Sequence, residues 1–198
     1  DLPALIAHLL KEFSANGGTL VTDQGAAKLI VENGRAVGAH TAAGNRFAGD
    51  AVLLATGPSV PAMVAEAGQR IDDGTPVALL IMTKPLHHPL KAVLNTPRVA
   101  VRPAPDGGFS VDADWAADEV STNADGSYDV RQSTLDALLA EASKILEGHP
   151  KLEVAAYGAG RKPIPGDGEP VMGELSAIPG YYVAFSHSGA TLGLIVGE

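Results

Sequence analysis

A run of small residues follows a short apolar strand near the carboxyl end of the chain. The strand is predicted over residues 181–185, and the run extends from Ser186 to Gly193, where a helix should begin. Backbone N–H groups at such a turn are little shielded by side chains, so they could bind an anion or the polar edge of a ring. An ordinary glycine-rich turn has the same composition, so the run alone leaves both interpretations open.

Two adjacent cations, Arg161 and Lys162, stand in a glycine- and proline-rich segment of an acidic chain. Such a pair could hold a substrate carboxylate. A solvated surface pair is the alternative, because most lysines and arginines are exposed. Neighbouring side chains of an extended segment point in opposite directions, so we expect only one of the two to face a ligand.

A second candidate binding segment, Ala55-Thr56-Gly57, ends the apolar run 51–55. Such a run is typical of a strand that is buried on both faces in a parallel sheet. Ligands of open α/β sheets lie beyond the carboxyl ends of the strands. The alternative is a strand that simply ends in glycine.

The histidines His87, His88 and His149 do not predict a metal site. Adjacent residues on a strand point to opposite faces, and no further ligand occurs at metal-binding spacing nearby. Ser186-His187-Ser188 is no catalytic triad, since adjacency along the chain does not create the geometry of a nucleophile and its base. No catalytic residue therefore stands out.

Composition excludes several classes of protein. The net charge of -9 and the pI of about 5.0 argue against binding to nucleic acid or to anionic membranes. There is no cysteine, which excludes disulfides and thiolate metal sites, and no apolar run approaches the roughly 18 residues of a membrane span. We therefore expect a cytoplasmic protein. Because the chain starts without Met and ends in an apolar run, we also expect it to be a portion of a longer protein.

The spacing of apolar residues predicts the elements that must position these groups. Asn33-Gly34 is a strong signal for a hairpin turn. The first predicted elements are a helix over 2–16, strands over 19–22, 27–32, 35–41 and 51–55, and a short helix over 62–67.

The pattern changes near residue 70, where longer strands separated by Pro- and Gly-rich turns begin. The elements predicted there are strands over 77–83, 92–101 and 108–115, a surface loop over 118–130, a helix over 133–146 and a strand over 153–157. These elements indicate an α/β fold with an attached antiparallel sheet.

The closing residues, taken in order, carry a family resemblance. The quoted pattern is Gly160-x-Lys162-Pro163, Asp167-Gly168-x-Pro170-x-x-Gly173, Gly180-Tyr181-Tyr182-Val183-Ala184 and His187-Ser188-Gly189. It resembles the closing signature of the D-amino-acid oxidase superfamily, which includes glycine oxidase and sarcosine oxidase. The resemblance extends over nearly the whole chain and is weakest between residues 70 and 150.

The resemblance implies a Rossmann-like FAD-binding domain over residues 1–70 and 156–198, and a mixed or antiparallel substrate domain over 71–155. It also implies an FAD-dependent oxidase that transfers hydride from a C–H bond next to nitrogen to the flavin, with oxygen as acceptor. The substrate would be a small amine or amino acid, bound by Arg161 or Lys162. The residues that it places along the FAD are Ala26, Ala55, Thr56, Gly57, Gly160, His187, Ser188, Gly189, Ala190, Thr191 and Leu192.

Two departures from the family pattern matter. The Gly-x-Gly-x-x-Gly turn that holds the pyrophosphate does not occur in these 198 residues, so FAD is expected for the intact protein and not necessarily for this chain. Lys162 stands where the family has arginine, and lysine lacks the bidentate fork. Because there is no cysteine, covalent attachment of flavin through that residue is excluded, and FAD should bind non-covalently.

Two other functions stay open. One is a flavoprotein dehydrogenase of the same fold that passes electrons to a quinone or a partner protein. The other is a non-catalytic module that folds without flavin, since fold does not determine function. The sequence predicts neither the substrate nor an oligomeric state.

Overall fold

The computed structural model describes residues 2–197, which form two compact units. One unit is Val77–Arg161, and the other combines Leu2–Pro76 with the residues from Lys162 onward. The borders therefore lie a few residues beyond the predicted ones at 70 and 155. The assignment of one unit to the cofactor and the other to the substrate stays a prediction.

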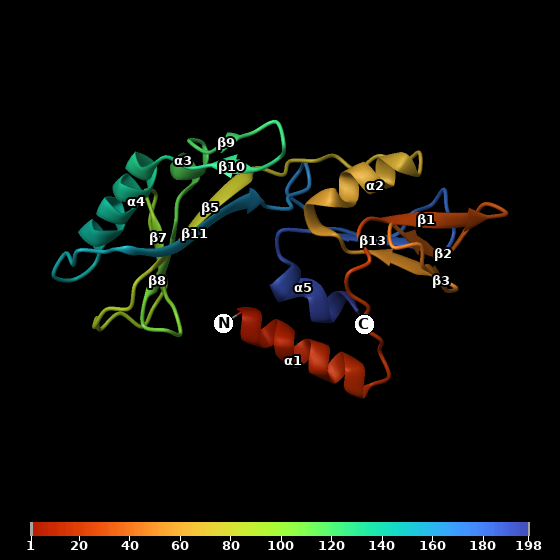
Figure 1. The fold of residues 1–198 in the computed structure, drawn as a ribbon, viewed down its shortest axis with the longest axis horizontal. Helices are drawn as coiled ribbons and strands as arrows, with labels where there is room; N and C mark the ends of the chain where they lie inside the picture. Colours follow the sequence, from red (N-terminus) through yellow and green to blue (C-terminus); the bar gives the residue numbers. More distant parts are fainter. Residues whose placement is uncertain (1, 198) are drawn as a thin grey trace. The chain divides into compact units, whose positions relative to one another are not determined.

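The unit Val77–Arg161 is built on a five-stranded antiparallel sheet in the order β11-β5-β8-β7-β6. Its core lies between one face of this sheet and the helices α3 and α4, which Figure 1 shows in green and teal. The elements are β5 (Val77–Thr83), β6 (Leu94–Asn95), β7 (Ala100–Pro103), β8 (Phe109–Asp112), α3 (Asp114–Ala117), β9 (Ser121–Thr122), β10 (Tyr128–Asp129), α4 (Gln132–Ile145) and β11 (Val154–Arg161).

The other unit holds two three-stranded sheets, β1-β2-β3 and β12-β13-β4. In the second sheet β13 pairs in parallel with β4, which confirms the predicted α/β class. The elements are α1 (Leu2–Ala15), β1 (Ala27–Glu32), β2 (Arg35–Thr41), β3 (Arg46–Ala48), β4 (Val52–Leu54), η1 (Gly57–Ser59), α2 (Val60–Glu66), β12 (Val171–Glu174), β13 (Tyr181–Phe185) and α5 (Gly189–Val196).

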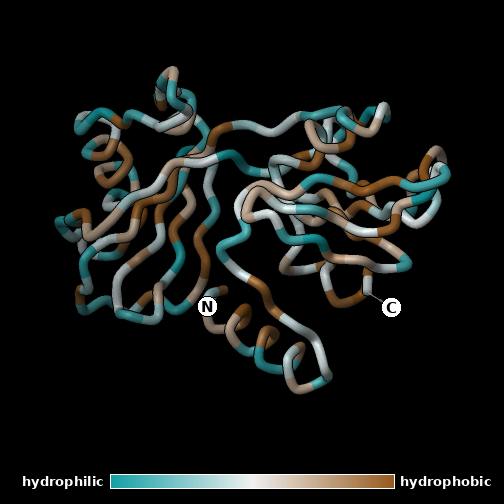
Figure 2. The backbone as a smooth tube through the Cα atoms, turned by 45° about the vertical axis from the view of Figure 1, so that its right-hand side comes forward, coloured by the Kyte–Doolittle hydropathy of each residue, from teal (hydrophilic) through white to brown (hydrophobic). Residues whose placement is uncertain are grey.

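Helix α1 forms as predicted, but none of its described residues is buried. Its apolar side chains recur at helical spacing, and in Figure 2 the tube of α1 alternates between brown and teal. The six large apolar residues Leu2, Leu5, Ile6, Leu9, Leu10 and Phe13 are each 38–51% exposed. Amphipathic spacing therefore predicted the helix correctly, although no core covers its apolar face among the residues described.

Three predicted strands differ from the structure. Residues 19–22 form no strand, since no neighbouring strand among residues 2–197 pairs with them. The segment 92–101 is broken by a turn in which the Thr96 hydroxyl accepts a hydrogen bond from Val99 N at 3.1 Å, so β6 and β7 form a hairpin. The strand expected over 108–115 ends at Asp112, because the chain turns there into α3.

Candidate functional site: an apolar cavity at the edge of the parallel strands

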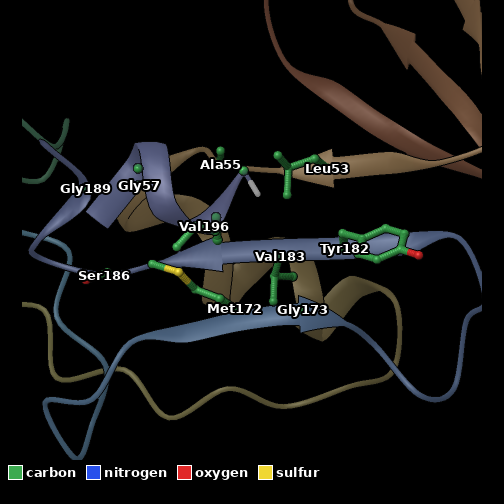
Figure 3. Close-up of a pocket in the computed structure, with 13 residues that line it drawn as sticks. Leu53, Ala55, Gly57, Met172, Gly173, Tyr182, Val183, Ser186, Gly189 and Val196 are labelled. Atoms are coloured by element: carbon green, nitrogen blue, oxygen red, sulfur yellow. The ribbon is translucent and has the colours of Figure 1, made fainter. Parts of the chain in front are cut away.

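A cavity of about 580 Å³ lies between the sheet β12-β13-β4 and helix α5. Figure 3 shows Leu53 and Ala55 from β4 and its end, Tyr182 and Val183 from β13, and Met172 from β12 around it. All of these elements belong to the same compact unit. Its volume falls in the range of about 300–1,000 Å³ that is typical of pockets for small molecules and cofactors.

The parallel pairing of β13 with β4 explains why the two candidate loops meet. Val183 lies opposite Leu54, so both strands end at the same edge of the sheet. The segment Ala55–Gly57 follows one strand, and the turn at Ser186 follows the other. Carboxyl ends of adjacent parallel strands are the ligand-binding edge of an α/β sheet.

Glycine at two positions keeps this edge free of side chains. Gly57 has a φ of +57°, a left-handed conformation that residues with a side chain rarely adopt. Gly189 lies at the start of α5, and a Cβ atom built there would meet nothing within 4 Å. Both line the cavity, so a ligand could approach the backbone closely at each of them.

The amino end of α5 points partial positive charge at this turn. Leu192 N makes the first helical hydrogen bond, to Ser188 O at 2.9 Å, so the N–H groups of Gly189 and Ala190 precede the helical ladder. The Ser188 side chain does not cap the helix, because its hydroxyl is hydrogen-bonded to His187 Nδ1 at 2.9 Å. The helix end can therefore bind a negatively charged or polar group.

The cavity contains three of the eleven residues predicted to lie along the FAD, namely Ala55, Gly57 and Gly189. Thr56 lies between two of them, but its hydroxyl is directed at the sulfur of Met63, 3.4 Å away. The neighbouring residues His187, Ser188, Ala190, Thr191 and Leu192 belong to the same turn and helix without lining the cavity.

The remaining predicted site residues lie elsewhere. Ala26 is exposed beside β1, where its carbonyl accepts a hydrogen bond from Ala42 N at 2.8 Å. Gly160 and Arg161 end β11 in the unit Val77–Arg161, whereas Lys162 belongs to the other unit. Arg161 and Lys162 are both exposed.

Several residues that line the cavity were not predicted from the sequence. Gly193 closes the candidate run that starts at Ser186 but was not among the residues predicted along the FAD. Gly193 on α5 and Gly197 just after it follow Gly189 at intervals of four, a spacing that helical periodicity could have revealed. Met172 and Tyr182 lie on β12 and β13, and finding them requires the register of those strands.

The lining is nearly devoid of charge. Tyr182 is the one side chain with an ionisable group among the described residues that line the cavity. Behind the sheet, Tyr181 is only 2% exposed, and burial followed by the nearby charge of Glu66 raises the pKa of its hydroxyl. The site therefore offers backbone dipoles and apolar surface but no charged side chain.

The rings of His88 and His149 have partners within the chain. The ring of His88 packs edge-on against Phe109 and lies 3.1 Å from Glu147 O through Nε2. His149 Nδ1 lies 3.2 Å from Ser143 O. No group of three or more potential metal ligands occurs within residues 2–197. Nor does that part of the chain contain a helix with the length and hydrophobicity of a membrane span.

The fold and this cavity define an α/β protein with a candidate ligand site at the carboxyl edge of its parallel strands. More specifically, the chain belongs to the family of FAD dependent oxidoreductases (DAO), whose model matches residues 1–198. This match confirms the predicted resemblance. A comparison with curated proteins finds no match.

Solved structures share the fold at low sequence identity. Iminodiacetate oxidase from Chelativorans sp. BNC1 is 20% identical, with a TM-score of 0.75 over 98% of this chain and 52% of that one. Glycine oxidase from Bacillus cereus ATCC 14579 is 22% identical, with a TM-score of 0.67 over 86% and 46%. L-proline dehydrogenase from P. horikoshii is 18% identical, with a TM-score of 0.74 over 93% and 50%. The chain thus spans about half the length of these structures.

Proposed function

We propose that the intact protein is an FAD-dependent oxidoreductase that oxidises the C–N bond of an amine or amino acid, with FAD bound non-covalently. The observation that carries this proposal is the glycine-lined apolar cavity at the carboxyl edge of β4 and β13, next to the amino end of α5. Family membership supports the cofactor.

The residues of the cavity fit a flavin in two respects. Leu53, Met172 and Val183 supply apolar surface for a planar aromatic ring. Gly57 and Gly189 leave backbone N–H and C=O groups accessible for the polar edge of a ring or for its side chain.

Bound flavin would accept the hydride, which protein side chains cannot do. The role of the chain would be to bind the flavin and the substrate and to orient them. Arg161 and Lys162 are the candidates for holding a substrate carboxylate, as a lysine or arginine at this position could pair with it. No general base is required of the lining, in agreement with its lack of charged side chains.

Two electron acceptors are consistent with the fold. The structures of iminodiacetate oxidase and glycine oxidase support oxygen, which we favour. The structure of L-proline dehydrogenase supports the alternative, in which electrons pass to a quinone or a partner protein. We place the protein in the cytoplasm, acting on a small molecule rather than on nucleic acid.

The experiment is anaerobic titration of the FAD-loaded protein with amines and amino acids, followed by the flavin absorbance. Bleaching by a substrate, and recovery with release of peroxide in air, is the expected result. Bleaching with recovery only after a quinone is added would indicate the dehydrogenase. An intact protein that takes up no FAD would overturn the proposal and favour the third possibility, a non-catalytic module.

A further inference from the structure

Two Asn-Gly pairs occur in the chain, and the structure places both of them at turns. Asn16-Gly17 follows helix α1, and Asn33-Gly34 joins β1 to β2. All four residues are exposed. Asparagine is a thermolabile residue, and a following glycine has no side chain to hinder attack of its nitrogen on the asparagine side chain. The local structure therefore decides which pair reacts.

Hydrogen bonds hold both reacting groups of Asn16-Gly17. The side-chain amide of Asn16 donates to Glu12 O at 2.8 Å, and its backbone N–H donates to the same oxygen at 3.0 Å. Gly17 N donates to Ser14 O at 3.1 Å. With a φ of +88° at Gly17, these bonds form a closed carboxyl-terminal cap of α1. Attack by the glycine nitrogen would have to break this cap.

The reacting groups of Asn33-Gly34 have no such bonds. Within residues 2–197, the side-chain amide of Asn33 makes no hydrogen bond, and Gly34 N donates none. The two residues are the central positions of a two-residue hairpin turn, with φ of +50° and +76°. The amide carbon and the attacking nitrogen are therefore both accessible and without a competing partner.

The end of this hairpin can open without disturbing a buried part of β1. Ring closure requires rotation about the Cα–C bond of Asn33, so the residue pairs next to the turn must separate first. Two such pairs lie between the turn and the irregularity in the register after Ile30. No residue of β1 is buried, and segments with few buried contacts open at a low cost in free energy. The folded protein can therefore reach the reactive geometry at this turn.

We propose that Asn33 is a site of spontaneous covalent modification, at which the folded protein acquires aspartate and isoaspartate. Gly34 N forms a bond to Cγ of Asn33, and the side-chain nitrogen leaves as ammonia with the proton from Gly34 N, which gives a cyclic succinimide. Water then opens the ring. Cleavage of the bond to Cγ gives aspartate, and cleavage of the main-chain bond gives isoaspartate. The reaction needs no oxidant and no cofactor, so it is independent of the proposed function.

The modification reaches the core through Ala36 on β2. Ala36 is fully buried in the cluster that contains Tyr181, and its N–H donates to Pro179 O at 2.9 Å. Isoaspartate lengthens the main chain of the turn by one carbon atom, so β1 and β2 no longer meet in the observed register. The modified chain also carries an added negative charge beside Glu32. Both changes lower the stability of this unit.

The test is incubation of the intact protein at mildly alkaline pH, followed by peptide mapping with mass spectrometry. The peptide that contains residue 33 should show the mass change from amide to acid, and it should accept methyl groups from labelled S-adenosylmethionine and an isoaspartate methyltransferase. Conversion at Asn33 should be at least about tenfold faster than at Asn16, because two hydrogen bonds of the reacting groups must break at Asn16. Equal rates at the two sites would overturn the proposal, as would conversion at Asn33 only in urea.

Asn33→Gln is the matched control, because glutamine would have to form a ring that is one atom larger and closes much more slowly. This variant should gain no isoaspartate at residue 33. After incubation, the parent should melt lower by roughly 2–4 °C, the shift that corresponds to about one lost hydrogen bond in a chain of this length. Incubated Asn33→Gln should melt as it did before incubation. An equal fall in both proteins would overturn the assigned link between Asn33 and the core.

Discussion

Replacement of Thr83 by valine tests how the sheet of the unit Val77–Arg161 is held together. Thr83 lies at the end of β5 and is fully buried. Its hydroxyl accepts a hydrogen bond from Phe109 N at 2.9 Å and donates one to Lys84 O at 3.1 Å. Valine keeps the shape of the side chain but removes both hydrogen bonds.

The loss of stability follows from the polar groups that would be left without a hydrogen-bond partner. A buried donor without a partner costs about 1–3 kcal/mol, and the Phe109 N–H would become such a donor. A domain of under 100 residues loses roughly 4–8 °C in melting temperature per kcal/mol, whereas a chain of about 200 residues loses roughly 2–4 °C. With a loss of about 2 kcal/mol, the transition should fall by roughly 8–16 °C if Val77–Arg161 melts alone, and by about half as much if the chain melts as one.

Differential scanning calorimetry of the parent, Thr83→Val and Thr122→Val measures this. The control changes an exposed threonine of the same unit. A surface substitution changes the free energy of unfolding by no more than about 0.5 kcal/mol, so the melting temperature of Thr122→Val should shift only by the amount that corresponds to this change. Two resolved transitions, of which Thr83→Val moves only one, would show that the units unfold separately. An unchanged melting temperature in Thr83→Val would refute the assigned role of the hydroxyl.

Three further changes address the cavity and the cations. Gly189→Leu should lower FAD affinity at least about tenfold in an absorbance titration. The variant should melt at a temperature no lower than that of the parent, because glycine is a poor helix former. An unchanged FAD affinity would contradict the assigned cavity. Burial and then Glu66 raise the pKa of Tyr181 above 10.0, so stability is full below that pH and falls as the pH rises through the raised pKa. Tyr181→Phe should therefore show a smaller drop in melting temperature between about pH 9 and 11, and an equal drop would argue against this linkage. Lys162→Arg should lower the KM for an amino-acid substrate several-fold at constant flavin content, because arginine pairs bidentately with carboxylate; an unchanged KM would leave Arg161 as the candidate.

Local signals predicted the parts of the fold that depend on neighbours in sequence. The hairpin at Asn33-Gly34 forms with both residues at positive φ, as its composition indicates. The helix predicted over 133–146 is observed as α4, because its apolar spacing matches the face that packs on β8. Resemblance added the family, which composition could not supply.

Contacts between distant segments decided what the sequence could not show. Residues 19–22 have the composition of a strand, but a strand also needs a partner for its backbone. The cavity residues Met172 and Tyr182 come together only through the pairing of β12 with β13. Likewise, the face of the sheet that Gly158 and Gly160 share is known only once β11 is aligned with β5.

Strand β4 affects how the protein behaves in concentrated solution. It is the edge strand of its sheet within the described residues, and Leu53 at its centre is 63% exposed. An open apolar edge is a template on which strands of other molecules can add. Two features limit such association: β4 is only three residues long, and the net charge of -9 makes copies of the chain repel each other. Because salt screens this repulsion, high ionic strength or a pH near 5.0 should favour self-association through this edge.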